Sequence, residues 1–515
     1  MITRMEAYIV NSLSCQMYKK DYKEFLNIKD LRMAQEKILL GILARNQEAE
    51  YGRAYDFCKI KSILDFQERV PLTDYEDYVP YIERILKGEK GVLTEEEVLL
   101  LEPSSGSASA SKFIPYTQSL KNEFQNGIRP WLYDLYSTKP GIKSGKSYWS
   151  VTPAATKRRH SEAGIPIGFE EDQEYFGALE KKLLDRVMAV PGGVAKAETM
   201  EDFYYQTSLA LLQCKELTLI SIWNPTFLLL ILDFMKRNSE SLASEIDTRD
   251  RIRAKEVRGF LEQEDFNSLW KDLKLISCWG DANAGIYAQR LMELFPGVEL
   301  QPKGLLATEG FVSFPLTEAG GAVLSIRSHF FEFQAQKDGR IYTADQLIMG
   351  DSYSVILTTS GGFYRYRLKD LIRVKGFYRG IPVIEFLGKQ DKVSDLFGEK
   401  LNEIFVRNTL EKLGIKEGFH MLAPETDRYV FFTADPKITK EHQRKMDQLL
   451  RENFHYDYCR KLGQLKEMRI FKLTGNPEKE YLEECVRRGQ RLGDIKTTPL
   501  QTKGGWDKSL KGEYL

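Results

Sequence analysis

The sequence predicts an α/β protein built from more than one domain, and three observations lead to this prediction. The chain has 515 residues, more than one hydrophobic core usually organises, so two to four domains are expected. Hydrophobic residues make up 42% and charged residues 29%, the composition of an ordinary globular protein rather than a disordered, collagenous or repeat protein. Between about residues 95 and 390, short apolar runs alternate with helical patterns, which indicates mixed sheets with many parallel strands.

The first hundred residues are rich in charge and predict helices, with helical spacing of apolar residues from Leu31 to Ala44. The most apolar stretch runs from Leu217 to Met235 and is long enough to cross a bilayer. Asn224 and Pro225 divide it, and proline is favoured in the first turn of a helix. We therefore expect a buried strand, a turn and a buried helix here, and no membrane span.

Further strands are expected where short apolar runs are rich in β-branched and aromatic residues. These runs are Lys274–Trp279, Gly321–Ile326, Ser354–Thr358, Val383–Leu387, Arg428–Phe432 and Glu467–Lys472. After Leu387 comes a segment rich in lysine and aspartate, and then a second α/β pattern. We expect a large N-terminal domain over residues 1–387 and a smaller, mobile C-terminal α/β domain over residues 388–515, with a hinge near 388–392.

The balance of charge narrows the range of partners. The chain has 74 Lys+Arg and 74 Asp+Glu residues and a formal net charge of zero. Proteins that bind nucleic acids or anionic membranes rely on surplus basic residues, so neither partner is expected, whereas a small anionic ligand needs only local positive charge. The six cysteines form no CxxC pair and no cluster with the five histidines. This spacing favours reduced thiols in the cytoplasm over a zinc site or disulfides.

The first segment that carries chemistry is a run of small polar residues from Ser104 to Lys112, SSGSASASK. Its hydroxyls and backbone N–H groups can surround phosphate oxygens, and the lysine adds a positive charge. The spacing is not that of a Walker A loop. A solvated serine-rich linker is the alternative interpretation, although apolar residues flank the run on both sides.

Two more segments place a carboxylate after an expected strand. Glu309, in the segment GLLATEG (304–310), can hold Mg²⁺ through one oxygen while water and phosphates fill the other positions. The alternative there is a turn with a solvated glutamate. In YRYRLKD (364–370), Asp370 at the end of a strand can accept both hydroxyls of a ribose. The alternative there is an edge strand with exposed arginines.

A fourth segment, GKQDKVSDLFGEKL (388–401), indicates by itself only a charged hinge between domains. The four segments together resemble, in their order, the motifs of the adenylate-forming superfamily of acyl-CoA synthetases, luciferases and peptide-synthetase adenylation domains. In that comparison SSGSASASK resembles the phosphate loop, ATEG the magnesium motif, YRYRLKD the ribose-binding motif and the fourth segment the hinge. Lys369 stands where the ribose-binding motif has a glycine.

Within this superfamily the chain looks like a bacterial-type member of the Gretchen Hagen family of acyl-acid amido synthetases, the auxin-responsive enzymes. The resemblance extends from about residue 30 to residue 500. Besides the four segments, it rests on YGR (51–53), VPLTDY (70–75), KFIPYT (112–117), IPIGF (165–169), FEF (331–333) and RLGDIK (491–496).

The resemblance implies a fold of the adenylate-forming type, ATP as a co-substrate and Mg²⁺ as a cofactor. The residues that it places in the phosphate loop are Ser104, Ser105, Gly106, Ser107 and Lys112. It implies that Glu309 holds Mg²⁺, that Thr308 lies beside the α-phosphate and that Asp370 binds the ribose hydroxyls. The implied reaction activates a small carboxylic acid as an acyl-adenylate and transfers it to an amine, commonly an amino acid, to form an amide.

The resemblance also implies that the C-terminal domain rotates about Asp391 and brings a lysine to the α-phosphate. Lys496 is the first candidate and Lys503 the second, and a surface lysine in an exposed tail is the alternative. The acyl pocket is expected among Trp223–Pro225, Trp279–Gly280 and the strand before Glu309.

Two other functions stay open at the level of the sequence. One is a thioester ligase of the same fold that uses coenzyme A in place of the amine. The other is a protein that binds a nucleotide or an acyl group without turnover. A serine hydrolase is not favoured, because no G-x-S-x-G elbow stands out in the sequence.

Overall fold

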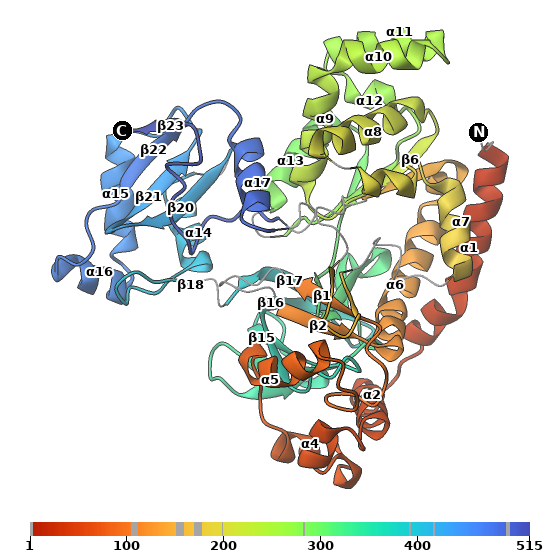
Figure 1. The fold of residues 1–515 in the computed structure, drawn as a ribbon, viewed down its shortest axis with the longest axis vertical. Helices are drawn as coiled ribbons and strands as arrows, with labels where there is room; N and C mark the ends of the chain where they lie inside the picture. Colours follow the sequence, from red (N-terminus) through yellow and green to blue (C-terminus); the bar gives the residue numbers. More distant parts are fainter. Residues whose placement is uncertain are drawn as a thin grey trace.

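The computed structural model describes residues 4–104, 112–150, 159–168, 178–197, 199–281, 284–390, 393–415, 418–490 and 495–515. Of the residues expected to act, Ser105, Gly106, Ser107 and Asp391 lie outside this set. The described chain forms a helical N-terminal region, a small parallel sheet, a large antiparallel sheet and a separate C-terminal α/β part (Figure 1).

The N-terminal region is helical, as expected. Its elements are α1 (Arg4–Leu26), α2 (Leu31–Arg45), α3 (Glu50–Ala54), the 3₁₀ helix η1 (Phe57–Lys59), α4 (Ile63–Arg69) and α5 (Tyr75–Leu86). The helix expected from Leu31 to Ala44 is confirmed as α2, which starts after Asp30 because that carboxylate accepts a hydrogen bond from the amide of Met33.

Four parallel strands form the sheet that positions the candidate pocket. They are, in spatial order, β3 (Lys146–Trp149), β6 (Leu217–Ser221), β7 (Leu275–Cys278) and β8 (Glu299–Pro302). The expected strand, turn and helix over Leu217–Met235 are confirmed, because β6 is followed by α9 (Pro225–Arg237) with Asn224 as its N-cap. The N-cap amide side chain accepts from the Thr226 N–H, and Pro225 occupies the first turn.

Helices surround this sheet (Figure 1). They are α6 (Gln118–Thr138), η2 (Pro140–Ser144), α7 (Ala178–Val187), η4 (Gly192–Lys196), α8 (Met200–Gln213), α10 (Ser239–Asp247), α11 (Arg251–Glu262), α12 (Phe266–Leu269) and α13 (Ala284–Leu294). Helix α6 also reaches the antiparallel sheet, so one helix supports both halves of the candidate site. No helix in the described part of the chain is long and apolar enough to span a membrane.

The largest sheet has seven strands. Their spatial order is β11 (Ser313–Leu316), β12 (Gly321–Leu324), β17 (Ile381–Lys389), β16 (Tyr366–Tyr378), β15 (Ser352–Thr358), β13 (Phe330–Ala335) and β14 (Ile341–Thr343). Every pair in it is antiparallel, and only the short helices η5 (Thr317–Ala319) and η6 (Ala344–Gln346) interrupt it among the described residues. The expectation of much parallel sheet was therefore wrong for this region. Strands buried on both faces read as continuous apolar runs in either kind of sheet, so the sequence carried no signal to tell them apart.

Smaller strands connect these layers. The sheet order β2 (Lys112–Tyr116), β1 (Leu100–Ser104), β5 (Pro166–Ile167) and β4 (Arg159–His160) contains an antiparallel pair formed by β1 and β2. A short hairpin, β9 (Leu306–Ala307) and β10 (Gly310–Phe311), leads from the parallel sheet into the antiparallel sheet. Both hairpins carry candidate site residues at or next to their turns.

The C-terminal part has its own sheet, in the order β20 (His420–Glu425), β21 (Arg428–Thr433), β22 (Arg469–Leu473) and β23 (Gly512–Tyr514). A short hairpin, β18 (Val393–Ser394) and β19 (Leu401–Asn402), precedes it. The helices of this part are α14 (Glu403–Lys412), α15 (Lys440–Leu450), α16 (Phe454–Lys461) and α17 (Pro477–Arg487). The two expected strands, Arg428–Phe432 and Glu467–Lys472, are confirmed as β21 and β22.

The C-terminal part packs against the parallel sheet and its helices. Figure 1 shows α17 beside α13, and an ion pair of 3.9 Å joins Arg290 on α13 to Glu478 on α17. One hydrophobic core cluster contains residues of both parts, among them Phe227 and Phe432. A second cluster, which includes Tyr429 and Leu450, belongs to the C-terminal part alone. The domain boundary near 388–392 stays a prediction.

All six cysteines are free thiols, and Cys58 is the exposed one among them. Burial raises the pKa of Cys214 to about 11 and that of Cys278 to about 12, so these thiols are held in the uncharged form at neutral pH. The cytoplasmic location inferred from the cysteine spacing stays a prediction.

Candidate functional site

The Thr308–Glu309 turn lies at the tip of the β9–β10 hairpin. Ala307 pairs with Gly310, so Thr308 and Glu309 are the two residues of a tight turn. Tyrosines from two other strands hold it: Tyr116 on β2 donates a hydrogen bond of 2.6 Å to the Thr308 carbonyl, and Tyr366 on β16 donates one of 3.3 Å to Glu309 Oε1. Glu309 is only 5% exposed, so the interpretation as a solvated turn glutamate does not fit.

A buried histidine forms a hydrogen bond with the backbone of the hairpin. The amide of Phe311, two residues after Glu309, donates a hydrogen bond of 2.9 Å to His329 Nε2. Because Nε2 is the acceptor, the ring hydrogen lies on Nδ1, which faces Glu123 Oε2 at 2.9 Å. Glu123 also accepts from the amide of Ser360. This series of hydrogen bonds fixes the position of the hairpin, and with it the position of the turn.

The serine-rich segment begins and ends on two strands that are paired. Ser104, the last residue of β1, lies opposite Lys112, the first residue of β2. The segment between them therefore joins two strands of one antiparallel hairpin. Ser105, Gly106 and Ser107 lie outside the described residues, so the phosphate loop and the solvated serine-rich linker both stay predictions.

Tyr75 connects the end of this hairpin with the turn. The Phe113 amide donates a hydrogen bond of 2.6 Å to the Tyr75 hydroxyl, and Lys112 Nζ lies 5.4 Å from the centre of the Tyr75 ring. Burial raises the pKa of Tyr75, and the negative charge of Glu309 raises it further. Both the lysine and the glutamate are therefore neighbours of one tyrosine ring. Strand β2 also carries Tyr116, which holds Thr308, so the lysine and the turn share a rigid support.

Asp370 lies inside the 13-residue strand β16, not at the end of a strand as expected. It is 2% exposed and pairs in register with Lys389 on β17, whose Nζ is 3.7 Å from Asp370 Oδ1. Lys369 before it has φ of +62°, in the left-handed region that glycine adopts readily. Lys369, at the position where the resembled motif has a glycine, thus adopts a backbone conformation that glycine takes easily.

The arginines of YRYRLKD have structural partners. Arg365 is 6% exposed and forms a two-pronged ion pair with Glu332, with both N–O distances 3.0 Å. Its Nη1 also donates to the carbonyls of Gln67 and Val70. Strand β16 lies in the middle of the seven-stranded sheet. The alternative of an edge strand with exposed arginines was therefore wrong. The sequence of an edge strand with exposed arginines and that of a central strand with paired arginines look the same.

Lys496 reaches from the C-terminal part to the parallel sheet. Its Nζ lies 4.0 Å from the centre of the Trp279 ring and 5.7 Å from that of Phe386. The segment is anchored because Tyr481 donates to the Lys496 carbonyl at 3.0 Å and Asn224 donates to the Ile495 carbonyl. The carbonyl of Lys503 accepts from Trp506 three residues away, a contact within the C-terminal part. The structure thus brings Lys496 to the N-terminal part, next to Trp279 and Phe386.

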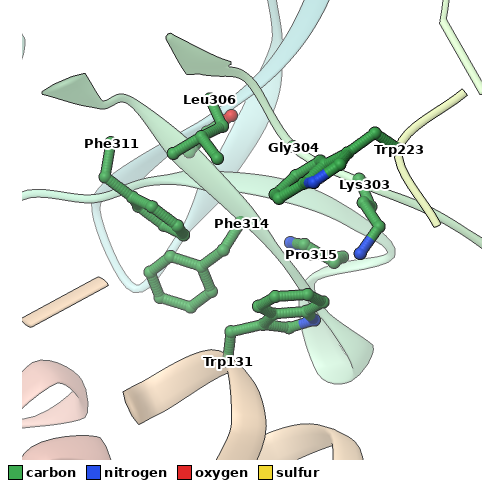
Figure 2. Close-up of a pocket in the computed structure, with 9 residues that line it drawn as sticks. Trp131, Trp223, Lys303, Gly304, Leu306, Phe311, Phe314 and Pro315 are labelled. Carbon is green, nitrogen blue, oxygen red and sulfur yellow. The ribbon is translucent and has the colours of Figure 1, made fainter. Parts of the chain in front are cut away.

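A small, open hollow lies at the base of the β9–β10 hairpin (Figure 2). Its lining residues are Trp131, Trp223, Lys303, Gly304, Leu306, Phe311, Ser313, Phe314 and Pro315. Leu306 and Phe311 face each other in register, and the turn with Thr308 and Glu309 follows directly. Trp223 and Leu306, which belong to two of the segments where the acyl pocket is expected, line this hollow, and the acyl pocket itself stays a prediction. Trp279 does not line the hollow, but its ring packs against that of Trp223, with the two ring centres 6.1 Å apart.

Sequence reasoning missed Lys303, which is 5% exposed and contributes the positive charge of this hollow. Its Nζ donates a hydrogen bond of 2.7 Å to Ser221 Oγ and lies 4.6 Å from the centres of the Trp131 and Trp223 rings. The Trp149 ring is 5.5 Å away. The signal that could have found it is a single lysine between a strand and an apolar run, in ELQPKGLL (299–306).

These side chains lie where α/β proteins bind ligands. Trp149 ends β3, Trp223 follows β6, Trp279 follows β7 and Lys303 follows β8. The four strands are parallel, so their carboxyl ends share one edge of the sheet, the edge at which ligands bind in such sheets. The site therefore combines an aromatic hollow with a turn that presents a carboxylate.

The donor set around the turn fits one kind of metal. Among the described residues, no three His, Cys, Asp or Glu side chains gather into a metal-binding group. Glu309 is instead a single buried carboxylate with hard oxygen donors. Mg²⁺ is bound in many proteins through one or two carboxylates, with phosphate oxygens and water as the remaining ligands. The Glu309 site fits that use and does not fit a metal held entirely by protein side chains.

Comparison with known proteins agrees with this arrangement. The family model described as the GH3 family N-terminal domain matches residues 23–300, and that of the GH3 family central domain matches residues 322–389. The indole-3-acetic acid-amido synthetase GH3.4 of Arabidopsis thaliana is 23% identical over 459 residues, which cover 79% of this chain and 75% of the relative. GH3.15 of the same plant, which carries the same description, is 24% identical over 427 residues, or 73% and 70% of the two chains.

A solved structure of the GH3.15 acyl acid amido synthetase matches with a TM-score of 0.78 at 20% identity and covers 96% of this chain and 95% of its own. At this identity the match shows a shared fold. The interpretation as a bacterial-type member stays a prediction. On the two family models, which together include most of the parallel sheet and most of the antiparallel sheet, the chain belongs to the GH3 family.

Proposed function

We propose that this protein uses ATP to activate a carboxylic acid as an acyl-adenylate and then transfers the acyl group to an amine, forming an amide. The observation that carries the proposal is that the Thr308–Glu309 turn and two residues that line the hollow, Leu306 and Phe311, belong to one hairpin. An acid bound at this edge of the parallel sheet presents its carboxylate at the turn, beside the hairpin that carries the serine-rich segment.

The chemistry requires two displacement steps. A carboxylate oxygen attacks the α-phosphorus of ATP, the bond to the bridging oxygen breaks and pyrophosphate leaves. The amine then attacks the acyl carbon, loses a proton, and AMP leaves with the oxygen that came from the acid. A free carboxylate cannot acylate an amine, because its leaving group would be oxide. The protein's task in both steps is to position the reactants and to stabilise charge on the phosphates.

Each group at the site has a proposed part in these steps. Ser104, Lys112 and the segment between them bind the phosphates, and Thr308 lies beside the α-phosphate. Glu309 holds Mg²⁺, which offsets negative charge on the phosphates when it is bound. Asp370 accepts hydrogen bonds from the ribose hydroxyls. Its burial on a central strand, beside Lys389, gives that carboxylate a fixed position.

Lys496 is proposed as the lysine that reaches the α-phosphate during adenylation. In the present arrangement it lies over Trp279, at the carboxyl edge of the parallel sheet. A rotation of the C-terminal part about Asp391 moves Lys496 relative to the Thr308–Glu309 turn between the two steps. Contacts that join the N-terminal and C-terminal parts include a hydrogen bond from Arg407 to the Leu387 carbonyl, and the Arg290–Glu478 ion pair. Such a rotation has to break or rearrange both contacts.

The named relatives support the class of substrates. Two are called indole-3-acetic acid-amido synthetases, and one solved relative is an acyl acid amido synthetase in complex with 2,4-DB. We take the acid of this protein to be a small carboxylic acid and the amine to be an amino acid. The aromatic residues at this edge of the sheet, Trp131, Trp223 and Phe311 among them, favour an acid with an apolar body.

Product analysis with a library of acids and amines tests the proposal. Pyrophosphate release is expected only when an acid is present, and AMP release with amide formation only when an amine is added. Turnover completed by coenzyme A, with no response to amines, would instead establish a thioester ligase. ATP binding by calorimetry without pyrophosphate release from any acid would establish a nucleotide-binding protein without this activity.

A further inference from the structure

Strand β16 bulges at the residues that carry the proposed ribose contact. On β15, Ile356 lies opposite Arg367 of β16. The next pair is Ser354 with Leu371, so β16 has three residues where β15 has one, and Asp370 is among the three. Bulges are frequent beside active sites, where they redirect a side chain. The direction of the Asp370 carboxylate therefore depends on the shape of this bulge.

Lys369 lies in the bulge with a backbone conformation that lysine rarely adopts. Its φ of +62° is in the left-handed region, where a residue with a Cβ atom is strained and glycine is not. Such strain persists only where contacts with the surrounding structure offset it. On the backbone, the Lys369 carbonyl accepts a hydrogen bond of 2.7 Å from the amide of Gln390. A second contact comes from the side chain, which reaches Asp74 at the start of α5.

Asp74 binds two basic side chains of β16. Arg367 donates to both of its carboxylate oxygens, from Nε to Oδ1 at 3.2 Å and from Nη2 to Oδ2. The ammonium of Lys369 lies 3.3 Å from Oδ1. All three side chains are only partly exposed. A single exposed ion pair contributes little to stability, whereas a two-pronged arginine contact that shares its carboxylate with a second cation is a geometry in which ion pairs do contribute.

The backbone next to Asp74 is joined to the same strand. The amide of Thr73 donates a hydrogen bond of 3.1 Å to the Arg365 carbonyl, and the amide of Arg367 donates one of 2.9 Å to the Thr73 carbonyl. Thr73 thus pairs with Tyr366 as a short parallel bridge. The position of Asp74 relative to β16 is therefore fixed by the backbone, and its carboxylate is held beside the bulge.

We propose, on the basis of the proposed function, that Asp74 is a positioning residue of the nucleotide site: by pairing with Lys369 it stabilises the left-handed backbone that directs the Asp370 carboxylate toward the ribose. In this role Asp74 acts through Lys369 and needs no contact with the nucleotide. Its contribution depends on the residue at position 369, because glycine adopts the same backbone conformation without a partner. This dependence distinguishes a positioning role from a general contribution to stability.

Calorimetric titration with ATP and with 2′-deoxy-ATP, both in the presence of Mg²⁺, reports the ribose contact. The wild type is expected to bind ATP about 10- to 100-fold more tightly than 2′-deoxy-ATP, the range for a hydrogen bond to a charged group. Asp74→Ser keeps a side chain that can cap α5 and removes the carboxylate. It is expected to lower this ratio about three- to fivefold, the upper range for such ion pairs, and to change the affinity for 2′-deoxy-ATP less than about twofold.

Variants at position 369 show whether Asp74 acts through the backbone. Lys369→Ala removes the ammonium and keeps the strain, so it is expected to lower the ratio as Asp74→Ser does. The double variant Asp74→Ser with Lys369→Gly is expected to restore the wild-type ratio to within about twofold, because glycine needs no partner in this conformation. Asp30→Ser is the matched control, because Asp30 is the N-cap of α2, and it is expected to leave the ratio unchanged.

The outcomes separate this inference from the proposed function. The inference is overturned by an unchanged ratio in Asp74→Ser, by a loss that Lys369→Gly does not restore, or by equal binding of the two nucleotides to the wild type. Acid-dependent pyrophosphate release by the same wild-type preparation would then leave the proposed reaction standing. Conversely, the expected pattern of ratios without pyrophosphate release from any acid would support the role of Asp74 and count against adenylation.

Discussion

The amide of Phe311 donates a hydrogen bond of 2.9 Å to Nε2 of His329, and both residues are buried. Through this bond the Thr308–Glu309 turn, on the β9–β10 hairpin, is fixed to the antiparallel sheet. His329 holds its tautomer because its other nitrogen faces Glu123. A residue that touches no proposed substrate therefore sets the position of one that does.

Replacing His329 by phenylalanine leaves the Phe311 amide and the Glu123 carboxylate without this partner. We expect the free energy of unfolding to fall by about 1–3 kcal/mol, the cost of an unsatisfied buried polar group, in urea titrations. His329→Gln, which can accept and donate in the same directions, is expected to recover part of the loss. The exposed His455 on α16 provides the control His455→Phe. A His329→Phe protein as stable as the wild type would show that the bond does not support the hairpin.

Glu309→Gln keeps the shape of the side chain and removes its charge. If Glu309 holds Mg²⁺ at the phosphates, acid-dependent pyrophosphate release falls by about 10²- to 10³-fold, and the Mg²⁺ concentration for half-maximal rate rises. The exposed Glu293 on α13 provides a control of the same chemistry, Glu293→Gln. An unchanged rate and Mg²⁺ dependence in Glu309→Gln rules out the metal role.

Lys496→Ala and Lys503→Ala decide between the two candidate lysines. Pyrophosphate release is expected to fall by about 10²-fold or more for Lys496→Ala and to stay within about twofold for Lys503→Ala. Amide formation from a synthetic acyl-adenylate should change little in either variant, because the lysine acts on the first step. The reverse ranking of the two variants would move the role to Lys503.

Asp281 gives a prediction for the pH dependence of stability. Burial raises the pKa of its carboxyl, the nearby charge of Glu385 adds to this, and the hydrogen bond from the Phe386 amide opposes it. Because the folded-state pKa lies above the ordinary 3.8, the folded protein binds this proton more tightly than the unfolded chain. The contribution of Asp281 to stability therefore decreases as pH rises from about 3.8 through the raised pKa.

Asp281→Asn can still accept from the Phe386 amide and carries no charge to bury. We expect it to unfold at a higher urea concentration than the wild type at pH 7, with the difference shrinking toward pH 4. Asp338 is the control with the opposite sign, because its hydrogen bond from the Arg340 amide lowers its pKa, so Asp338→Asn should be less stable than the wild type at pH 7. If Asp281→Asn unfolded at a lower urea concentration than the wild type at pH 7, the ionised Asp281 carboxylate would be stabilising, contrary to this prediction.

Much of the fold follows from local patterns in the sequence. Helix α2 and the β6–turn–α9 unit were predictable because Asp30, Asn224 and Pro225 mark helix starts. The direction of the strands in the seven-stranded sheet was not, because strands buried on both faces carry continuous apolar runs whether their neighbours are parallel or antiparallel. The position of Asp370 inside β16 was also missed. Lys369 just before it has a left-handed backbone conformation, which a lysine in the sequence does not predict.

The candidate site residues Thr308, Glu309, Lys112 and Asp370 come from sequence motifs, and their roles stay predictions. Lys303 and His329 do not come from motifs, because each gains its role from partners distant in sequence: Lys303 from Trp131, Trp149 and Trp223, and His329 from Glu123. Contacts of that kind depend on tertiary structure and leave no local pattern.

In the proposed reaction the acid attacks the α-phosphorus of ATP before it meets the amine. Mass spectrometry of the products from an acid labelled with ¹⁸O in both carboxylate oxygens tests this order. One ¹⁸O atom is expected in AMP and one in the amide, because one carboxylate oxygen leaves with the phosphate and the other stays on the acyl carbon. Unlabelled AMP, or ¹⁸O in pyrophosphate or phosphate, would contradict it.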